Sequence, residues 1–210
     1  MTARIFGGQG VVIETPGPGP DLRSSPVYLR QRHQRLPQPQ DAEDREHDLE
    51  TLAVVVEEPE RLALRTLELD APGDADVVVD INWSGISTGT ERLLWSGAMP
   101  PFPGLAYPLV PGYESNGRVR EAGPRSGRQP GQLVFVPGAR CYGEVQGLFG
   151  GAASCVVLPG ERAVPIHEEF AEHGVLLALA ATAYNAMRAP EGGFRIPELI
   201  VGHGVLGRLL

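Results

Sequence analysis

Three glycines near the end of the chain have the spacing of a dinucleotide-binding turn. Gly202, Gly204 and Gly207 form the pattern G-x-G-x-x-G directly after a short apolar run. Glycines at this spacing let the backbone approach a pyrophosphate, and the N-terminus of the following helix favours its negative charge. His203 and Val205 are the neighbouring residues whose backbone N–H groups would face the phosphates. The pattern predicts a cofactor site.

The elements around this turn predict the start of a βαβ unit. Such a unit needs about 30 residues, whereas only three residues follow Gly207. We therefore expect residues 197–210 to hold the first strand, at 198–201, and the glycine turn of a truncated Rossmann α/β domain. A linking region, residues 167–196, precedes it and contains one long helical candidate over 168–187.

Upstream of the linking region, the sequence is typical of a β-rich domain. Short apolar or alternating runs are separated by glycine and proline, a pattern that predicts a barrel-like body over residues 50–166. Thr88 as N-cap and Glu91 three residues later predict a short helix over 88–95. The expected strands are 52–56, 61–69, 76–83, 117–121, 132–136, 152–158 and 163–166.

Residues 1–49 differ from the rest of the chain. The proline-rich stretch 16–20 and the acidic stretch 41–48 show no sustained period of 2 or 3.6. We expect a disordered tail or an extension that is not part of the native protein. A regulatory or docking tail is the alternative.

Composition excludes several classes of protein. The net charge of −8 argues against nucleic acid as a partner. Two cysteines, Cys141 and Cys155, cannot build a disulfide framework or a four-cysteine zinc lobe, which suits a reducing cytoplasm. No stretch of 18 apolar residues is present, so no stable membrane insertion is expected.

Five segments, in this order and spacing, resemble the medium-chain dehydrogenase/reductase superfamily. The resemblance implies a GroES-like β domain followed by a Rossmann domain that binds a nicotinamide cofactor. The segments are 84–91 (SGISTGTE), 110–119 (VPGYESNGRV), 131–137, 179–184 and 202–207.

Longer matches narrow this resemblance. Residues 84–97, 99–104, 107–115, 135–141 and 147–154 are similar to the bacteriochlorophyllide dehydrogenases of photosynthetic bacteria, and the likeness begins near Glu50. It implies a cytoplasmic enzyme of bacteriochlorophyll biosynthesis that uses NAD to oxidise the 3-(1-hydroxyethyl) group of a bacteriochlorophyllide, a tetrapyrrole, to 3-acetyl. The 210-residue chain by itself is expected to bind NAD no better than millimolar and to turn nothing over. An oligomer is compatible with this reading.

The resemblance also implies that no metal is used. The catalytic zinc of the superfamily is held by a cysteine, a histidine and a third cysteine or acid. The matching positions here are Ser87, Tyr113 and Ala178, none of which is a usual zinc ligand. We therefore expect a metal-free enzyme.

Without zinc, side chains must manage the hydroxyl proton. Tyr113, Glu114, Ser87 and Thr88 are the candidate catalytic residues. An unperturbed tyrosine has a pKa of about 10, so a tyrosine base needs a cationic neighbour or a relay. The alternatives are that Tyr113 only packs, that Ser87 and Thr88 serve a turn or cap, that Glu114 is an anchor, and that Glu91 caps a helix.

Apolar loop residues are candidates for contact with a large flat ring, although such residues also pack within their own domain. They are Trp95, Met99, Pro101, Phe102, Leu105 and Tyr107.

Two other functions stay open. One is a zinc-free medium-chain reductase that uses NADPH on an enone or quinone. The other is a truncated substrate-binding domain without catalysis.

Overall fold

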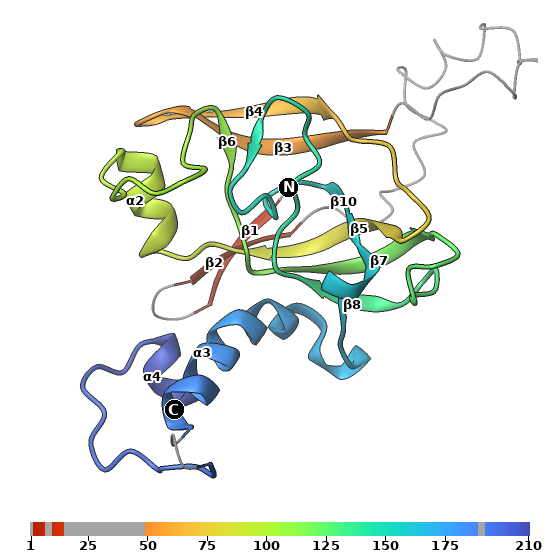
Figure 1. Cartoon of the computed structure of the whole chain (residues 1–210). Helices are drawn as coiled ribbons and strands as arrows, with labels where there is room; N and C mark the ends of the chain where they lie inside the picture. Colours follow the sequence, from red (N-terminus) through yellow and green to blue (C-terminus); the bar gives the residue numbers. More distant parts are fainter. Residues whose placement is uncertain (1, 7–9, 15–48, 189–191) are drawn as a thin grey trace, which may run out of the picture.

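The computed structural model describes residues 2–6, 10–14, 49–188 and 192–210. Strands make up most of this structure, and a helical arm from the C-terminal part of the chain lies below them in Figure 1. The predicted mainly β body followed by helices is confirmed. Among the described residues, no helix has the length and apolar character needed to cross a bilayer.

The larger sheet is built around β5 (Asp76–Gly85). β7 (Ser115–Ala122) pairs along one edge of β5, and β10 (Cys155–Pro159) pairs with the first half of the other edge. β8 (Leu133–Val136) pairs with β7, and β11 (Val164–Pro165) pairs with β8. All of these pairs are antiparallel.

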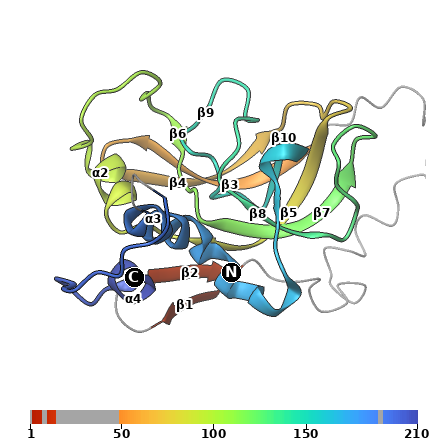
Figure 2. The same ribbon diagram turned by 60° about the horizontal axis from the view of Figure 1, so that its bottom comes forward.

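The smaller sheet packs against the larger one. It has the order β4-β3-β6-β9, and Figure 2 shows it above β5 and β7. The core between the sheets consists of side chains from both, including Val55, Val77, Val79, Val134 and Val136. The four strands of the smaller sheet are β3 (Glu50–Glu58), β4 (Arg61–Glu68), β6 (Leu109–Val110) and β9 (Gln146–Gly147).

All seven strands predicted over 52–166 have a counterpart in the structure, with shifted ends. β6 and β9 were not predicted, because two residues are too few to show an alternating pattern.

A hairpin near the N-terminus extends the larger sheet. β1 (Thr2–Phe6) pairs with β2 (Gly10–Glu14), and β2 pairs with residues 83–85 at the end of β5. The sequence predicts no strand within residues 1–49, so this hairpin differs from the prediction. These two strands form by pairing with each other and with β5, which the local sequence pattern cannot report. Residues 15–48, most of the expected extension, lie outside the described residues.

The helix after β5 begins later than the sequence predicts. α2 covers Thr90–Ser96, its N-cap is Gly89, and no side chain caps it. The prediction of Thr88 as N-cap is therefore wrong. The backbone N–H of Ser87 instead donates to Oε2 of Glu91, so the carboxyl of Glu91 ties the loop to the first turn of the helix.

The single helix predicted over 168–187 is interrupted. A 3₁₀ helix (η4, Glu168–Leu176) precedes α3 (Leu177–Met187), and within it Ala171 has φ 39 and ψ −122. The fully buried Asn116 of β7 donates its Nδ2 to the carbonyl O of Ala171 at 2.9 Å. A Cβ on Gly174 would lie 2.4 Å from the same Nδ2, so glycine is needed there. Asn116 thus holds the break, because losing the bond would leave the buried amide of Asn116 without this acceptor, which costs free energy.

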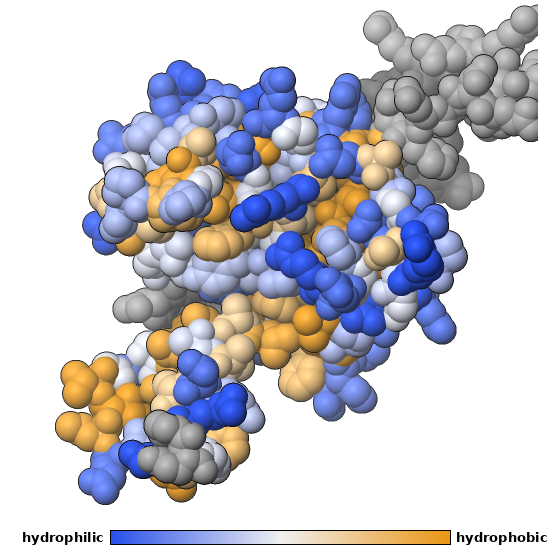
Figure 3. All heavy atoms as spheres, viewed as in Figure 1, coloured by the Kyte–Doolittle hydropathy of each residue, from blue (hydrophilic) through white to orange (hydrophobic). Residues whose placement is uncertain are grey.

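The strand predicted at 198–201 is absent from the structure, and this prediction is wrong. Residues 198–201 form no ladder, because none of the described strands lies alongside to pair with them. The short helix predicted after the glycine turn is present as α4 (Val205–Leu209). Apolar side chains gather on the surface of this arm in Figure 3. The most exposed are Ile196, Leu199 and Val201, at 88%, 79% and 91%.

Gly117 provides a test of the contact between β5 and β7. An ideal Cβ on Gly117 would lie 1.9 Å from the carbonyl O of Asp80. We expect Gly117→Ala to lower the free energy of unfolding by about 2–3 kcal/mol, since the strands must separate to relieve the overlap. Urea denaturation followed by circular dichroism measures this. Gly89→Ala is the matched control, because the space around Gly89 is open. Equal urea midpoints for the two variants would contradict the close strand contact.

Candidate active site

The end of β5 lies beside the start of β7, and this contact places the candidate residues. The N–H of Gly85 donates to the carbonyl O of Glu114 at 2.6 Å. A Cβ on Gly85 would lie 2.8 Å from Oε2 and 3.0 Å from Cβ of Glu114. Only a glycine at position 85 therefore leaves room for the carboxyl of Glu114 in this position.

Three hydroxyl groups meet above this contact. The OH of Tyr113 donates to Oγ of Ser87 at 2.6 Å, and Oγ1 of Thr90 lies 3.4 Å from the same OH. The ring of Tyr113 packs edge-on against Phe149, with ring centroids 5.3 Å apart. Tyr113 thus both packs and forms a hydrogen bond. The sequence had left open whether its side chain only packs or also has a polar role. Thr88 lies outside this hydroxyl cluster.

Since Ser87 accepts the hydrogen of Tyr113, its own hydroxyl hydrogen is free to point elsewhere. Ser87 lines a cavity on the side of the C-terminal arm. The hydroxyl cluster therefore offers that cavity an oriented O–H donor.

Two glutamates flank the hydroxyl cluster. Burial raises the pKa of Glu91 to about 8, the N–H of Ser87 partly offsets this, and the nearby Glu114 adds to it. Burial also raises the pKa of Glu114, partly offset by Tyr113. Glu114 is only 5% exposed, and its Oε1 is buried without a hydrogen-bond partner among the described residues. The sequence favoured a capping role for Glu91 over a chemical one, because burial of a carboxyl cannot be read from residue type.

A cavity of about 490 Å³ separates the end of β5 from the C-terminal arm. Ser87, Thr88 and Glu114 line one side of it, and the glycine turn lines the other. The structure therefore brings the four sequence-predicted catalytic residues and the cofactor turn to one region, with Tyr113 behind Ser87. The remaining lining is mostly apolar and comes from Gly85, Ile86, Val175, Leu176, Leu179, Pro197, 199–202, 204–207 and Leu210.

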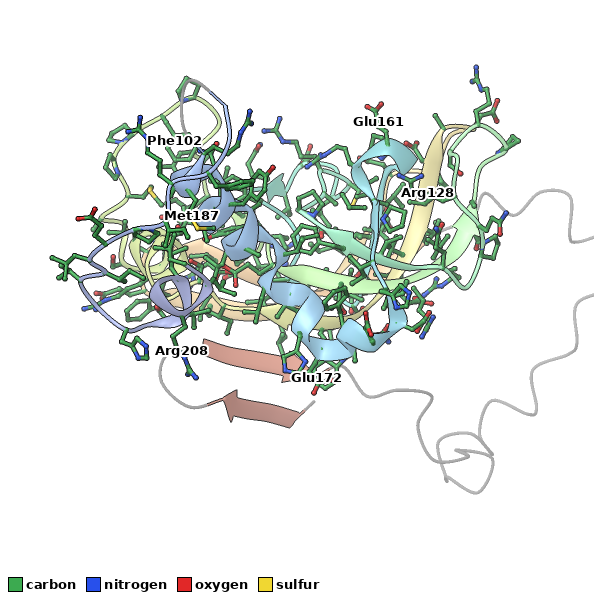
Figure 4. All side chains as sticks on the ribbon, turned by 90° about the horizontal axis from the view of Figure 1, so that it is seen from below. Phe102, Arg128, Glu161, Glu172, Met187 and Arg208 are labelled. Atoms are coloured by element: carbon green, nitrogen blue, oxygen red, sulfur yellow. The ribbon has the colours of Figure 1, made fainter. Side chains whose placement is uncertain are left out.

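The glycine turn has the local geometry that its pattern requires. Gly202 has φ +94, which favours glycine, and a Cβ on Gly207 would lie 2.6 Å from the carbonyl O of Gly202. Gly204 is the N-cap of α4, and its carbonyl O accepts the N–H of Arg208 at 3.0 Å. Val205 lines the cavity, whereas His203 is exposed and does not. In Figure 4, Arg208 and Met187 lie at the same end of the molecule as Phe102, away from Arg128 and Glu161.

A second, more apolar cavity of about 880 Å³ lies over β3, β4 and α2. Leu52, Leu62, Leu64 and Trp95 line it and are each at least 40% exposed. Residues 85, 86 and 88 line both cavities, so the two cavities share one wall. Glu91 and Arg92 lie at the second cavity.

Half of the loop residues proposed for ring contact pack inside the protein. Met99, Leu105 and Tyr107 pack against a small core of Val56, Leu94, Leu109 and Leu148, and the OH of Tyr107 donates to the carbonyl O of Leu94. These three partly buried residues therefore have a packing role, and their contact with a ring stays a prediction. Trp95 is the member of the group that lines a cavity. Sequence position alone could not separate these roles.

The residues at the positions of the zinc ligands do not fit a metal. The hydroxyls of Ser87 and Tyr113 are hydrogen-bonded to each other, and Ala178 has no donor side chain. Among the described residues, no cluster of three or more His, Cys, Asp or Glu side chains could hold a metal ion. Burial raises the pKa of Cys141 to about 12 and that of Cys155 to about 11, so both thiols stay protonated and packed.

Sequence comparison identifies the β body. Residues 73–168 match the profile of the alcohol dehydrogenase GroES-like domain. These residues form a GroES-like domain. Together with its flanking segments, the domain is 51% identical over 167 residues to a 2-desacetyl-2-hydroxyethyl bacteriochlorophyllide A dehydrogenase of Cereibacter sphaeroides, covering 77% of this chain and 52% of that protein.

A protein of the same name from Rhodobacter capsulatus is 50% identical over 163 residues, covering 77% of this chain and 51% of that protein. The chain thus spans about half the length of the curated relatives that it matches.

Solved dehydrogenase structures share the fold of the GroES-like domain. A putative zinc-binding dehydrogenase of Sinorhizobium meliloti, bound to NADP, has a TM-score of 0.52 at 25% identity and covers 67% of this chain and 47% of its own. A cobalt- and zinc-bound thermostable alcohol dehydrogenase from Pyrobaculum aerophilum has a TM-score of 0.52 at 26% identity. The match covers 68% of this chain and 50% of that protein. An alcohol dehydrogenase of E. coli in complex with NADH has a TM-score of 0.52 at 24% identity. The match covers 65% of this chain and 44% of that protein.

The raised pKa of Glu91 predicts a pH-dependent stability. The folded protein holds a proton on Glu91 up to pH about 8, whereas the unfolded chain releases it near the ordinary value of about 4.3. Between these values the folded state binds more protons, so stability falls as pH rises, by at most about 1.4 kcal/mol per pH unit. Glu91→Gln removes the part of this fall that is due to Glu91, leaving a shallower slope, and its amide oxygen can still accept the N–H of Ser87. Urea denaturation at pH 5, 6, 7 and 8 measures how the free energy of unfolding depends on pH in the unmodified protein and in the variant. Equal slopes in the two proteins would refute the raised pKa of Glu91.

Proposed function

We propose that this chain is part of a cytoplasmic, NAD-dependent enzyme that oxidises the 3-(1-hydroxyethyl) group of a bacteriochlorophyllide to 3-acetyl. The observation that carries the proposal is the 51% identity over 167 residues to a relative that bears the name of this dehydrogenase. Because the chain spans about half the length of that relative, we assign the activity to the gene product at its full natural length. The 210-residue chain alone is expected to be inactive.

The glycine turn supports a nicotinamide dinucleotide as cofactor. The positive φ of Gly202 and the absence of a Cβ on Gly207 let the backbone at Gly202 fold back against α4. A G-x-G-x-x-G turn that is folded this tightly would bring its backbone close to a pyrophosphate. When bound, the cofactor supplies a nicotinamide ring that accepts a hydride. Of the two nicotinamide dinucleotides, we propose NAD.

The hydroxyl cluster supports oxidation of an alcohol. In this proposal Ser87, held by Tyr113, donates its hydrogen to the substrate oxygen and orients the carbinol toward the cofactor side of the cavity. Orientation of this kind lowers the entropic cost of reaching the transition state. Thr88, in the wall between the two cavities, limits how the substrate side chain can enter.

The apolar cavity supports a large flat substrate. Its volume of about 880 Å³ lies within the range of about 300–1,000 Å³ for small-molecule sites. It adjoins the hydroxyl cluster through the shared wall, so a ring bound there can direct one substituent toward Ser87. Trp95 presents an indole at the edge of this space, which suits stacking against a conjugated ring.

An optical assay tests the proposed activity. The full-length gene product is incubated with 3-hydroxyethyl bacteriochlorophyllide and NAD, and the absorption of the pigment is followed. Conversion to the acetyl form shifts the absorption band because the new carbonyl is conjugated with the ring. An unchanged spectrum at saturating NAD would overturn the proposal. Consumption of NADPH with an enone or quinone would favour the reductase instead.

Trp95→Ala tests whether the apolar cavity holds the ring. We expect the KM for the pigment to rise about tenfold, equivalent to about 1.4 kcal/mol of lost contact. The affinity for NAD should stay unchanged, because Trp95 does not line the cavity of the glycine turn. Steady-state kinetics and calorimetric titration with NAD measure the two quantities. Phe102→Ala, an exposed aromatic outside both cavities, is the control. The same KM in both variants would exclude Trp95 from the ring site.

A further inference from the structure

The carboxyl of Glu114 has an oxygen without a partner. It is 5% exposed, and its Oε1 has no hydrogen-bond partner among the described residues. Nearly all buried acceptors in proteins are hydrogen-bonded, so an orphan acceptor at a cavity indicates a missing donor. Glu114 lines the cavity that it shares with Ser87 and the glycine turn. A ligand hydroxyl in that cavity is a donor of the right kind.

The position of this carboxyl is fixed by its surroundings. The N–H of Gly85 holds the backbone of Glu114 at 2.6 Å, and the missing side chain of Gly85 leaves the space in which Oε2 lies. A carboxyl held from its backbone, in a pocket shaped for it, meets the requirement that a general base be positioned before the reaction.

Glu114 is also the only ionisable side chain among the described residues that line this cavity. Tyr113 already donates its hydrogen to Ser87, and no Arg or His lies in the lining to favour a phenolate. Glu91 accepts the N–H of Ser87 and lines the other cavity. The titratable groups around Glu114 are thus Tyr113 and Glu91, while the packed arm adds only apolar residues such as Val175 and Leu179.

We propose that Glu114 is the general base of the alcohol oxidation. Its carboxylate takes the hydroxyl proton of the substrate while the carbinol carbon gives its hydride to the C4 atom of the nicotinamide. The C–H and O–H bonds break, a C=O bond forms, the oxidised cofactor gains two electrons, and Glu114 gains the proton. This inference rests on the proposed function. Burial raises the pKa of Glu114 above the ordinary value of a glutamate, which makes its carboxylate a stronger base.

Kinetics of Glu114→Gln in the full-length gene product test the proposal. We expect kcat to fall about 100-fold to 10,000-fold, with the KM for NAD unchanged. In the unmodified enzyme kcat/KM should rise with pH as Glu114 ionises, and this rise should vanish in the variant. Glu91→Gln is the matched control, since it keeps the bond to Ser87, and it should retain the pH-dependent rise. Glu114→Ala with added formate should recover part of the lost rate, because formate can occupy the emptied space as a base.

An infrared readout is independent of turnover. Glu91 is a second buried carboxyl, so the carboxyl bands of three proteins are compared: the bands that are lost in Glu114→Gln but kept in Glu91→Gln belong to Glu114. Binding of the pigment alcohol should shift these bands. If Glu114→Gln does not fold by circular dichroism, Glu114→Asp replaces it and should lower kcat while keeping the pH dependence.

The outcomes separate this inference from the proposed function. An active unmodified enzyme whose Glu114→Gln variant keeps more than half of its kcat would overturn Glu114 as base and leave the proposed function standing. A pH-dependent rise that disappears only in Glu91→Gln would assign the base to Glu91 instead. An unmodified enzyme that does not oxidise the pigment would overturn the proposed function itself.

Discussion

The close pairing of β5 with β7 is the constraint on which the rest of the structure depends. Residues 117 and 85 lie on this seam, and both are glycines because the opposite chain occupies the space of a Cβ. At Gly117 the obstacle is the backbone of Asp80, whereas at Gly85 it is the side chain of Glu114. The same seam therefore holds the sheet together at one point and positions the carboxyl of Glu114 at another.

Much of the β body was predictable from the sequence, because strands with one buried face show an alternating pattern. The first half of β3 is of this kind. Features that depend on tertiary contacts were not predictable. The break at Ala171 requires Asn116, which is 55 residues away in the sequence. The predicted strand at 198–201 fails because a strand needs a neighbour, which the local pattern cannot report.

In the candidate site, too, residue types could be predicted from the sequence, whereas features that depend on tertiary contacts could not. Residue types and motif spacing selected Ser87, Tyr113, Glu114 and the three glycines, and the structure gathers them around one cavity, with Tyr113 in the layer behind. Sequence reasoning could not detect the burial of Glu91 or the unpartnered oxygen of Glu114, since both depend on what surrounds a carboxyl. Nor could it separate Tyr107, which packs against a small core, from Trp95, which lines a cavity, because this difference depends on tertiary contacts.

The hydrogen bond from Asn116 to Ala171 links the interior of the sheet to the helical arm. The bond reaches the start of the arm at Ala171. Two exposed hydrogen bonds between the ion pair Arg118 and Glu168, at 2.9 and 2.6 Å, also join β7 to the start of the arm. β7 carries both Asn116 and Arg118 and begins directly after Glu114. A single strand therefore sets the distance between the carboxyl of Glu114 and the glycine turn, so a small tilt of that strand would change this distance without altering the local geometry of either one.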